Sequence, residues 1–272
     1  MSRVAAIQLC SGPDVSENLR SASRWLDEAA RREARLAVLP ENFAFLGRSD
    51  RERLAAAEPF GDGRIQTFLA ERARELGMWI VGGTVPIATP AGERVRAACL
   101  LYDERGSLAA RYDKIHLFDV SLPDRDEHYR ESSATEPGSE MCVVATPFGK
   151  LGLAVCYDVR FPELFRRLLD AGMELLALPA AFTVPTGRAH WEVLIRARAI
   201  ENLCPVIAAA QEGKHPGGRE TYGDSMLVSA WGEVLERLPH GEGVIVADLD
   251  TMRGGGVRTR FPALDHRKQE LR

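Results

Sequence analysis

The 272-residue chain carries a formal net charge of -4 and has a sequence pI near 5.9. Hydrophobic residues make up 45% and charged residues 27%, a composition that excludes disordered, fibrous and membrane-embedded classes. The acidic balance predicts no basic face, so nucleic acid is not an expected partner. No apolar run approaches the ~20 residues that cross a bilayer, so no membrane partner is expected either.

The apolar segments predict an α/β fold. Short runs rich in Val, Ile, Leu and Ala indicate strands at residues 4–9, 36–39, 79–85, 99–102, 151–156, 175–178, 206–210 and 244–249. Helices are predicted from Ser16 as the cap to about residue 35, at 64–76, from Pro162 onward and at 190–203. Because no Ser/Gly-rich linker divides the chain, we expect residues 1–272 to form one domain.

The N-terminus and the cysteines bear on the compartment. Residues 1–9 run directly into an apolar segment without the cleavage site of a signal peptide, so a cytoplasmic location is expected. The cysteines are odd in number, scattered and never spaced as C-x-x-C, which favours reduced thiols over disulfides or zinc ligands. They are Cys10, Cys99, Cys142, Cys156 and Cys204. Since nucleotide-binding and metal-binding motifs are also missing from the sequence, we expect no cofactor and no metal.

A pattern of helix, strand and Leu-Pro occurs twice. Leu39-Pro40 is followed by Glu41, and Leu178-Pro179 is followed by Ala180, Ala181 and Phe182. The repeat indicates either two related halves whose strand ends meet at one site or a chance recurrence of a common pattern. If the halves are related, the first supplies catalytic polarity, and Phe182 and Thr183 of the second form a pocket wall.

Cys156 stands out among the five thiols. An apolar strand stops there, and a helix opened by Pro162 begins six residues later, which places the thiol on a strand-to-helix turn. The positive end of a helix dipole and a nearby cation would favour the thiolate form. The alternative is a buried structural thiol, which is the interpretation we favour for the other four cysteines.

A reactive thiol needs a base, and the six histidines offer no clear Cys-His pair. Glu41 follows a buried strand, where its carboxyl group is suited to proton transfer, although a surface position at the strand end is also open. Lys114 lies among aromatic and aliphatic residues, and its ammonium group is suited to stabilising an oxyanion. An ion pair between Lys114 and Asp113 or another acid is the alternative.

Together these three segments resemble the nitrilase, or carbon-nitrogen hydrolase, superfamily. Glu41 in L-P-E, Lys114 in Y-x-K-x-H and Cys156 in G-x-x-x-C-Y-D-x-R-F-P-E match, in order, its base, lysine and nucleophile. Glu131 matches a second glutamate of the family, although its polar loop also allows a solvated side chain. The resemblance implies a four-layer α-β-β-α sandwich that forms a homodimer or higher homo-oligomer. Residues 253–272 are expected to form a C-terminal tail that packs over a neighbour or the same chain.

Segments 190–202 and 222–226 resemble the Nit branch. Within it, segments 116–120, 187–191 and 209–211 are most similar to the deaminated glutathione amidases. This resemblance implies a cysteine amidase that cleaves a small carboxylate-bearing amide through a thioester, with deaminated glutathione giving 2-oxoglutarate and cysteinylglycine. An ω-amidase acting on 2-oxoglutaramate, an N-carbamoyl hydrolase and a true nitrilase remain alternatives. A non-catalytic metabolite-binding protein on the same scaffold is disfavoured, because the catalytic set is complete.

Substrate recognition is expected close to the nucleophile. Arg160, four residues after Cys156, is a candidate for holding a substrate carboxylate, and a structural pair with Glu163 or Asp158 is the alternative. The backbone N–H of Tyr157 is expected to share the oxyanion with the lysine.

Overall fold

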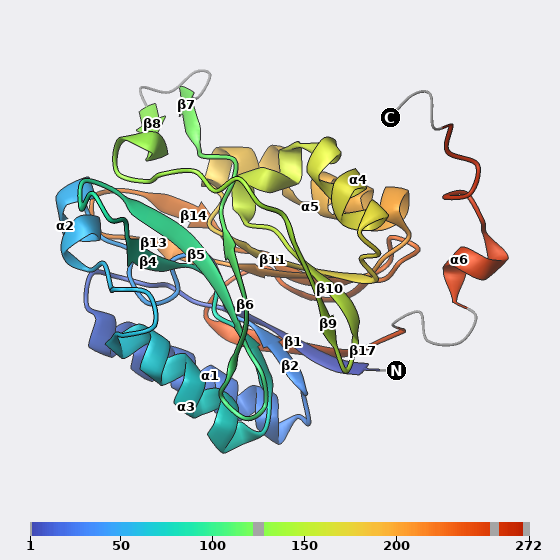
Figure 1. Ribbon diagram of the computed structural model, residues 1–272, viewed down its shortest axis with the longest axis horizontal. Helices are drawn as coiled ribbons and strands as arrows, with labels where there is room; N and C mark the ends of the chain where they lie inside the picture. The colour runs from blue at the N-terminus through green and yellow to red at the C-terminus, as the bar shows by residue number, and fades with distance from the viewer. Residues whose placement is uncertain (1, 122–127, 251–255, 269–272) are drawn as a thin grey trace.

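The computed structural model describes residues 2–121, 128–250 and 256–268. Two large β-sheets stack face to face, with helices on both outer sides (Figure 1). The first sheet has the order β17-β1-β2-β3-β5-β4, with β6 paired to β5, and the second has the order β16-β15-β12-β11-β10-β9. This arrangement is the four-layer α-β-β-α sandwich that the resemblance implies.

The bounds of the elements are as follows. The first sheet contains β1 (Ser2–Gln8), β2 (Leu36–Val38), β3 (Trp79–Val81), β4 (Val85–Ala88), β5 (Val95–Tyr102), β6 (Leu108–Asp113) and β17 (Gly243–Leu249). The second contains β9 (Cys142–Thr146), β10 (Gly149–Leu153), β11 (Leu175–Ala180), β12 (Val206–Ala210), β15 (Ser225–Val228) and β16 (Val234–Leu238). Two hairpins pair β7 (Asp119–Ser121) with β8 (His128–Arg130) and β13 (Glu212–Lys214) with β14 (Glu220–Tyr222). The helices are α1 (Val15–Arg31), α2 (Asp50–Ala55), α3 (Arg64–Leu76), α4 (Pro162–Asp170), α5 (Val184–Asn202) and α6 (Val257–Arg260), with 3₁₀ turns η1 (Glu131–Ser133) and η2 (Cys156–Arg160).

The two sheets share one topology. Strands β1, β2 and β3 are parallel and are flanked by antiparallel β17 and β5. Strands β10, β11 and β12 are likewise parallel and are flanked by antiparallel β9 and β15. In both triplets the strands are connected through helices, as parallel strands require. This symmetry agrees with two related halves rather than with a chance recurrence of Leu-Pro.

Side chains of β1 alternate between two cores. Val4 and Ala6 belong to the core between the sheets, whereas Ala5 and Ile7 belong to the core under α1 and α3. On the far side, α4 and α5 cover the second sheet (Figure 1). Phe165 of α4 belongs to the core that includes the strands of this sheet. Because the central strands are buried on both faces, they form the continuous apolar runs from which they were predicted.

The start of the first helix differs from the prediction. The Asp14 carboxylate accepts hydrogen bonds from the backbone N–H groups of Ser16 and Glu17 at 2.7 and 3.1 Å, so Asp14, not Ser16, is the N-cap. An ionised carboxylate at this position satisfies two unpaired N–H groups and interacts favourably with the helix dipole. The helix ends at Arg31, before Glu33, which has a φ of 62°.

Two predicted strands are shorter than expected. The run at 79–85 divides into β3 and β4, because Gly83 has a φ of 45° and a Cβ there would overlap the carbonyl oxygen of Pro40. The run at 151–156 leaves the sheet after Leu153, and Cys156 already belongs to η2. Val155 is still extended, so strand pairing ends before the thiol but the turn itself begins at Cys156. Helix α5, by contrast, starts at Val184, six residues before the predicted start at 190.

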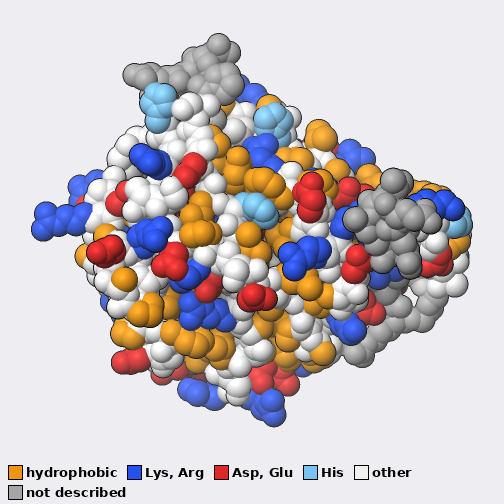
Figure 2. Space-filling model, turned by 45° about the horizontal axis from the view of Figure 1, so that its top comes forward, with side chains coloured by type: hydrophobic (Ala, Val, Ile, Leu, Met, Phe, Trp, Pro, Cys, Tyr) orange, Lys and Arg blue, Asp and Glu red, His pale blue; other side chains and the backbone are white. Residues whose placement is uncertain are grey.

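The predicted C-terminal tail at 253–272 lies partly outside the described residues. Its described part, 256–268, contains α6 and contacts the same chain. The Arg258 guanidinium donates to the carbonyl oxygens of Met173 and Leu203 at 2.8 and 3.1 Å. Within the described ranges, no helix is long and apolar enough to cross a bilayer. On the face in Figure 2, basic, acidic and hydrophobic side chains are interspersed.

Candidate active site

Four predicted site residues from four separate segments meet at one end of the sheets. Glu41 follows β2, Lys114 follows β6, Glu131 begins η1 and Cys156 begins η2. All four line one cavity of about 490 Å³. β2 belongs to the first sheet and β10 to the second, and the residues that follow the carboxyl end of each strand line the cavity.

Cys156 occupies a strained backbone position. Its φ is 49°, in the left-handed region that residues other than glycine rarely adopt, and such outliers cluster at functional sites. The residue is only 5% exposed, and its Sγ accepts a hydrogen bond from the Ala181 N–H at 3.5 Å. The turn therefore holds the thiol at a fixed point on the cavity wall.

Lys114 bridges the two glutamates. Its Nζ lies 2.7 Å from Glu41 Oε1 and 2.8 Å from Glu131 Oε2, and its side chain is 2% exposed. Asp113, the alternative partner, is instead paired with Arg111 at 2.8 Å. Lys114 therefore does form the ion pairs with other acids that the sequence left open, within a buried cluster of two carboxylates and one ammonium group.

The electrostatics of this cluster favour a neutral thiol. Burial raises the pKa of Cys156 well above its ordinary value, and the Glu41 carboxylate raises it further, whereas Lys114 lowers it. Lys114 thus acts in the direction expected from the sequence, but burial and the Glu41 carboxylate outweigh it, so the expected thiolate is not the favoured form. Burial alone would lower the pKa of Lys114, but Glu131 and Glu41 more than offset burial and raise it. The lysine is accordingly charged and the thiol protonated at neutral pH.

Glu131 is held inside the cluster and is not solvated. Its side chain is 12% exposed and accepts the backbone N–H of Phe118 at 2.8 Å in addition to Lys114. Burial would raise the pKa of Glu131, but Lys114, Arg53 and the two hydrogen bonds together lower it. Glu131 is therefore ionised and fixes the position of the ammonium group.

A second buried carboxylate ties the lysine segment to the thiol turn. Asp158 is fully buried, and its Oδ2 accepts from Tyr112 Oη at 2.7 Å and from the Val155 N–H at 2.8 Å. Its Oδ1 accepts the His116 N–H at 3.0 Å and lies 2.7 Å from His116 Nδ1. Residues on both sides of Lys114 thus bind a carboxylate two positions after Cys156. The sequence interpretation gave Tyr112 and His116 no role, although they flank the lysine in Y-x-K-x-H.

The four residues predicted to bind substrate also line the cavity. They are Tyr157, Arg160, Phe182 and Thr183. The Arg160 guanidinium lies over the Tyr157 and Phe182 rings, 5.7 and 5.1 Å from their centroids, and its Nη1 is 3.2 Å from His190 Nδ1. It therefore does not form the alternative pair with Glu163 or Asp158.

The cavity is also lined by arginines that were not predicted from the sequence. They are Arg48, Arg53, Arg130 and Arg219. Arg48 is paired with Glu52 at 3.2 Å, whereas the structure records no acidic partner for Arg219 within the described residues. These side chains come from a short helix, a loop and two hairpins, whose polar sequences carry no motif that points to a site. Among the described residues, no group of three or more His, Cys, Asp and Glu side chains could hold a metal ion.

Comparison with known proteins identifies the family. A family model described as carbon-nitrogen hydrolase matches residues 3–259. The chain belongs to the carbon-nitrogen hydrolase family. It is 40% identical over 268 residues to the deaminated glutathione amidase of Yersinia enterocolitica, a match that covers 98% of this chain and 93% of the relative.

Two solved structures extend the likeness to three dimensions. The NitFhit protein of Caenorhabditis elegans superposes with a TM-score of 0.92 at 36% identity, and the match covers 100% of this chain and 66% of that chain. Nit3 of Saccharomyces cerevisiae, a member of branch 10 of the nitrilase superfamily, gives a TM-score of 0.86 at 29% identity, with 99% and 96% coverage. This carbon-nitrogen hydrolase therefore has the Nit-branch resemblance and the sandwich fold predicted from its sequence.

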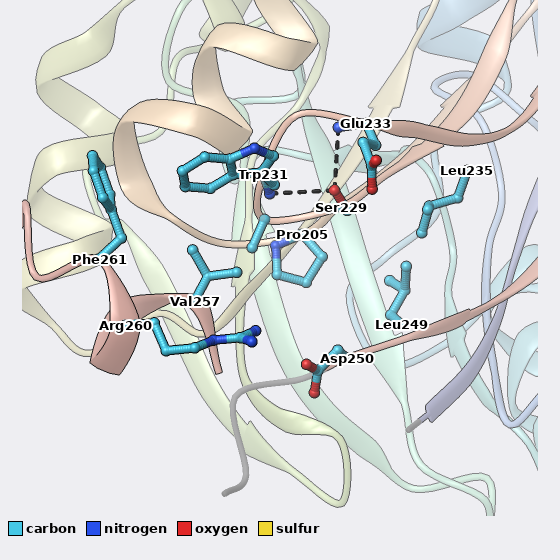
Figure 3. A pocket seen from close by; sticks show the side chains of 11 residues that line it. Pro205, Ser229, Trp231, Glu233, Leu235, Leu249, Asp250, Val257, Arg260 and Phe261 are labelled. Atoms are coloured by element: carbon cyan, nitrogen blue, oxygen red, sulfur yellow. Dashed lines mark hydrogen bonds between the residues drawn. The ribbon is translucent and has the colours of Figure 1, made fainter. Parts of the chain in front are cut away.

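A second cavity of about 490 Å³ lies elsewhere on this hydrolase, between α6 and the ends of β16 and β17 (Figure 3). Trp231, Leu235, Val257 and Phe261 supply most of its apolar lining. Its described lining residues include neither a thiol nor a buried ion cluster, and the Glu41-Lys114-Cys156 set lines the other cavity.

Proposed function

We propose that this carbon-nitrogen hydrolase is an amidase of deaminated glutathione and that Cys156 is its nucleophile. The observation that carries the proposal is the buried Glu41-Lys114-Glu131 cluster beside a protonated thiol in an arginine-lined cavity. The named relative from Yersinia enterocolitica supports the choice of substrate. Products would be 2-oxoglutarate and cysteinylglycine.

In the first half-reaction Glu41 accepts the thiol proton of Cys156, and Sγ attacks the amide carbonyl carbon. Because the thiol is neutral at rest, a base must act at this moment, and the Glu41 carboxylate contacts the thiol. Lys114 Nζ and the Tyr157 N–H stabilise the oxyanion. The carbon–nitrogen bond then breaks, Glu41 gives its proton to the leaving amine, and a thioester remains on Cys156.

In the second half-reaction Glu41, again ionised, removes a proton from water, which attacks the thioester. The carbon–sulfur bond breaks, and the proton returns from Glu41 to Cys156 Sγ as the acid product leaves. Glu131 holds the Lys114 ammonium group in place throughout, which its two contacts with Nζ at 2.8 and 3.1 Å support.

Charge in the cavity supports a substrate with two carboxylates. Among the described lining residues, Arg48, Arg53, Lys114, Arg130, Arg160 and Arg219 are basic, whereas only Glu41, Asp50 and Glu131 are acidic. Deaminated glutathione has one carboxylate on its acyl part and one on its leaving group, whereas 2-oxoglutaramate has only the first. We propose that Arg160 binds the acyl carboxylate, with Phe182 and Thr183 forming the wall beside it.

Rates on the two substrates test this choice. Each extra charge-assisted hydrogen bond contributes about 1.5–3 kcal/mol, so kcat/KM on deaminated glutathione should exceed that on 2-oxoglutaramate about 10- to 150-fold. Both are measured with the same enzyme at the same pH and salt concentration. A higher kcat/KM on 2-oxoglutaramate would make the chain an ω-amidase instead. A folded Cys156→Ala variant that still hydrolyses either amide would contradict the thioester mechanism, and Cys204→Ala, at a buried thiol outside the cavity, is its control.

We further propose that the enzyme is a cytoplasmic homodimer. Its five free cysteines are compatible with a reducing compartment, which fractionation of cells would test. The superfamily resemblance supports self-association, and so does the gathering of exposed apolar side chains beside the second cavity. These are Ile200, Trp231, Leu235 and Phe261, each at least 38% exposed.

A further inference from the structure

We propose that Arg219 binds the carboxylate on the leaving group and so determines specificity for amides whose amine product is acidic. This inference rests on the proposed amidase function, which assigns the acyl carboxylate to Arg160. It concerns a residue that the sequence analysis passed over and an end of the substrate for which no binding group has been identified.

Arg219 is held by a well-anchored hairpin. It precedes β14, and its carbonyl oxygen accepts the N–H of His215 at 2.8 Å across the turn. His215 is buried, and its ring nitrogens lie 2.8 Å from the Ser11 carbonyl oxygen and 2.6 Å from Thr221 Oγ1. The backbone of Arg219 is thus fixed from both sides, although the hairpin tip at 216–218 is exposed.

The guanidinium group of Arg219 lies close to the nucleophile. Its Nη2 donates to the carbonyl oxygen of Ala181 at 2.8 Å, and the N–H of Ala181 donates to Cys156 Sγ. On its other side it lies over the Tyr129 ring, 5.7 Å from the centroid. Arg219 therefore reaches across the cavity wall from the residue beside the thiol to the β7–β8 hairpin.

Most hydrogen-bonding capacity of this guanidinium is unused. A guanidinium carries five N–H donors, and the described residues supply an acceptor for one of them. Its Nε is buried and has no partner in this part of the structure, a cost that folded proteins usually avoid. No described acidic side chain is paired with it, in contrast to Arg48, which Glu52 neutralises. A planar, unpaired guanidinium in a cavity is suited to a carboxylate.

The positions of Arg160 and Arg219 assign them to opposite ends of the substrate. Arg160 is part of η2, the turn that carries Cys156, and the acyl group stays bonded to Cys156 until water releases it. Arg219 belongs to a different element whose exposed tip, Pro216 and Gly217, also lines the cavity and leads to solvent. The amine product must leave along such a path, so the group that recognises it is expected on this side.

The test compares three substrates in parallel. They are deaminated glutathione, its analogue with the terminal carboxylate replaced by a carboxamide, and 2-oxoglutaramate. Arg219→Gln should lower kcat/KM on deaminated glutathione about 10- to 150-fold and change it less than about threefold on the other two. Arg219→Lys, which keeps the charge but loses the planar group, should give an intermediate loss. Arg20→Gln, at a side chain that is 70% exposed on α1, has the same change in net charge and should behave as wild type.

Each result decides one question. A loss on deaminated glutathione that exceeds the losses on the other two substrates supports the assignment, whereas equal losses on all three, a larger loss on either of the other two, or no loss on deaminated glutathione overturns it. Wild-type enzyme supplies a check that needs no variant, because it should prefer deaminated glutathione over the carboxamide by the same factor. If wild type hydrolyses 2-oxoglutaramate but not deaminated glutathione, the proposed function itself fails, and the Arg219 assignment fails with it. Equal losses leave the proposed function standing.

Discussion

At the scale of single residues, Lys114 is the group on which the proposed mechanism depends most. It is buried with two carboxylates, and a buried charge cluster of this kind often contributes less to stability than an apolar replacement would. Its presence is better explained by function, since it supplies positive charge next to the thiol. The sequence motifs L-P-E, Y-x-K-x-H and C-Y-D identified Glu41, Lys114 and Cys156 as candidate site residues. The neutral state of the thiol depends on its burial, which no local motif encodes.

Replacing Glu131 by Gln should alter the acid side of the stability profile. The folded-state pKa of Glu131 is lowered from 4.5, so its ionised form stabilises the fold above about pH 4.5 and this contribution is lost as pH falls through the lowered value. Unfolding free energies from urea titrations between pH 3 and 7 should therefore fall less steeply in Glu131→Gln than in wild type. Glu17→Gln, at a 70% exposed side chain, serves as control. Parallel wild-type and Glu131→Gln profiles would contradict the assigned ionisation.

At the scale of elements, Asp158 couples the end of β6 to the turn after β10. Its carboxylate binds Tyr112 and His116, which lie on either side of Lys114. It also binds Val155, which directly precedes Cys156. His116 also stacks on Phe161 with ring centroids 3.7 Å apart. The distance between ammonium group and thiol is therefore set by a carboxylate that touches neither, which makes Asp158 a positioning residue.

Weakening the contacts of the Asp158 carboxylate should lower kcat more than it changes KM. A misplacement of about 1 Å can cost about 10²-fold in rate, so Asp158→Asn should lower kcat by about that factor with KM nearly unchanged. Tyr112→Phe removes one of the contacts and should have a smaller effect in the same direction. Tyr102→Phe, at another buried tyrosine in the core under α1 and α3, is the matched control. A rise in KM at constant kcat would show that Asp158 acts on substrate binding instead.

The elements that sequence predicts well are fully buried strands and helices with clear end signals. Central strands such as β11 and β12 are apolar throughout, and helix 64–76 has the predicted bounds because Gly63 and Gly77 delimit it. The polar hairpin β13–β14 was not predicted, since its register depends on pairing and on the buried His215, not on an apolar pattern. For the same reason Arg219 was missed, although residues 216–218, Pro-Gly-Gly, do mark a turn.

At the scale of the whole molecule, two matching sheets bring the proposed catalytic groups and pocket walls to one cavity. Residues after β2 include Glu41, and residues after β11 include Phe182 and Thr183, as the Leu-Pro repeat suggested. The opposite side of the second sheet carries the exposed apolar residues near α6. The single domain over 1–272 stays a prediction, which one cooperative thermal transition would support.

Self-association should depend on this apolar surface. Ile200 on α5 touches the turn that carries Trp231, and the Trp231 ring packs edge-on against Phe261 at 5.3 Å while remaining 56% exposed. A second copy related by a two-fold axis would bury the same side chains from both subunits. Ile200→Asp combined with Trp231→Ser should therefore convert a dimer to a monomer in sedimentation experiments. Leu108→Asp, at a 41% exposed side chain on β6, should remain dimeric. If the double variant sediments as wild type does, the subunits associate through another surface, and a monomeric wild type would contradict the dimer itself.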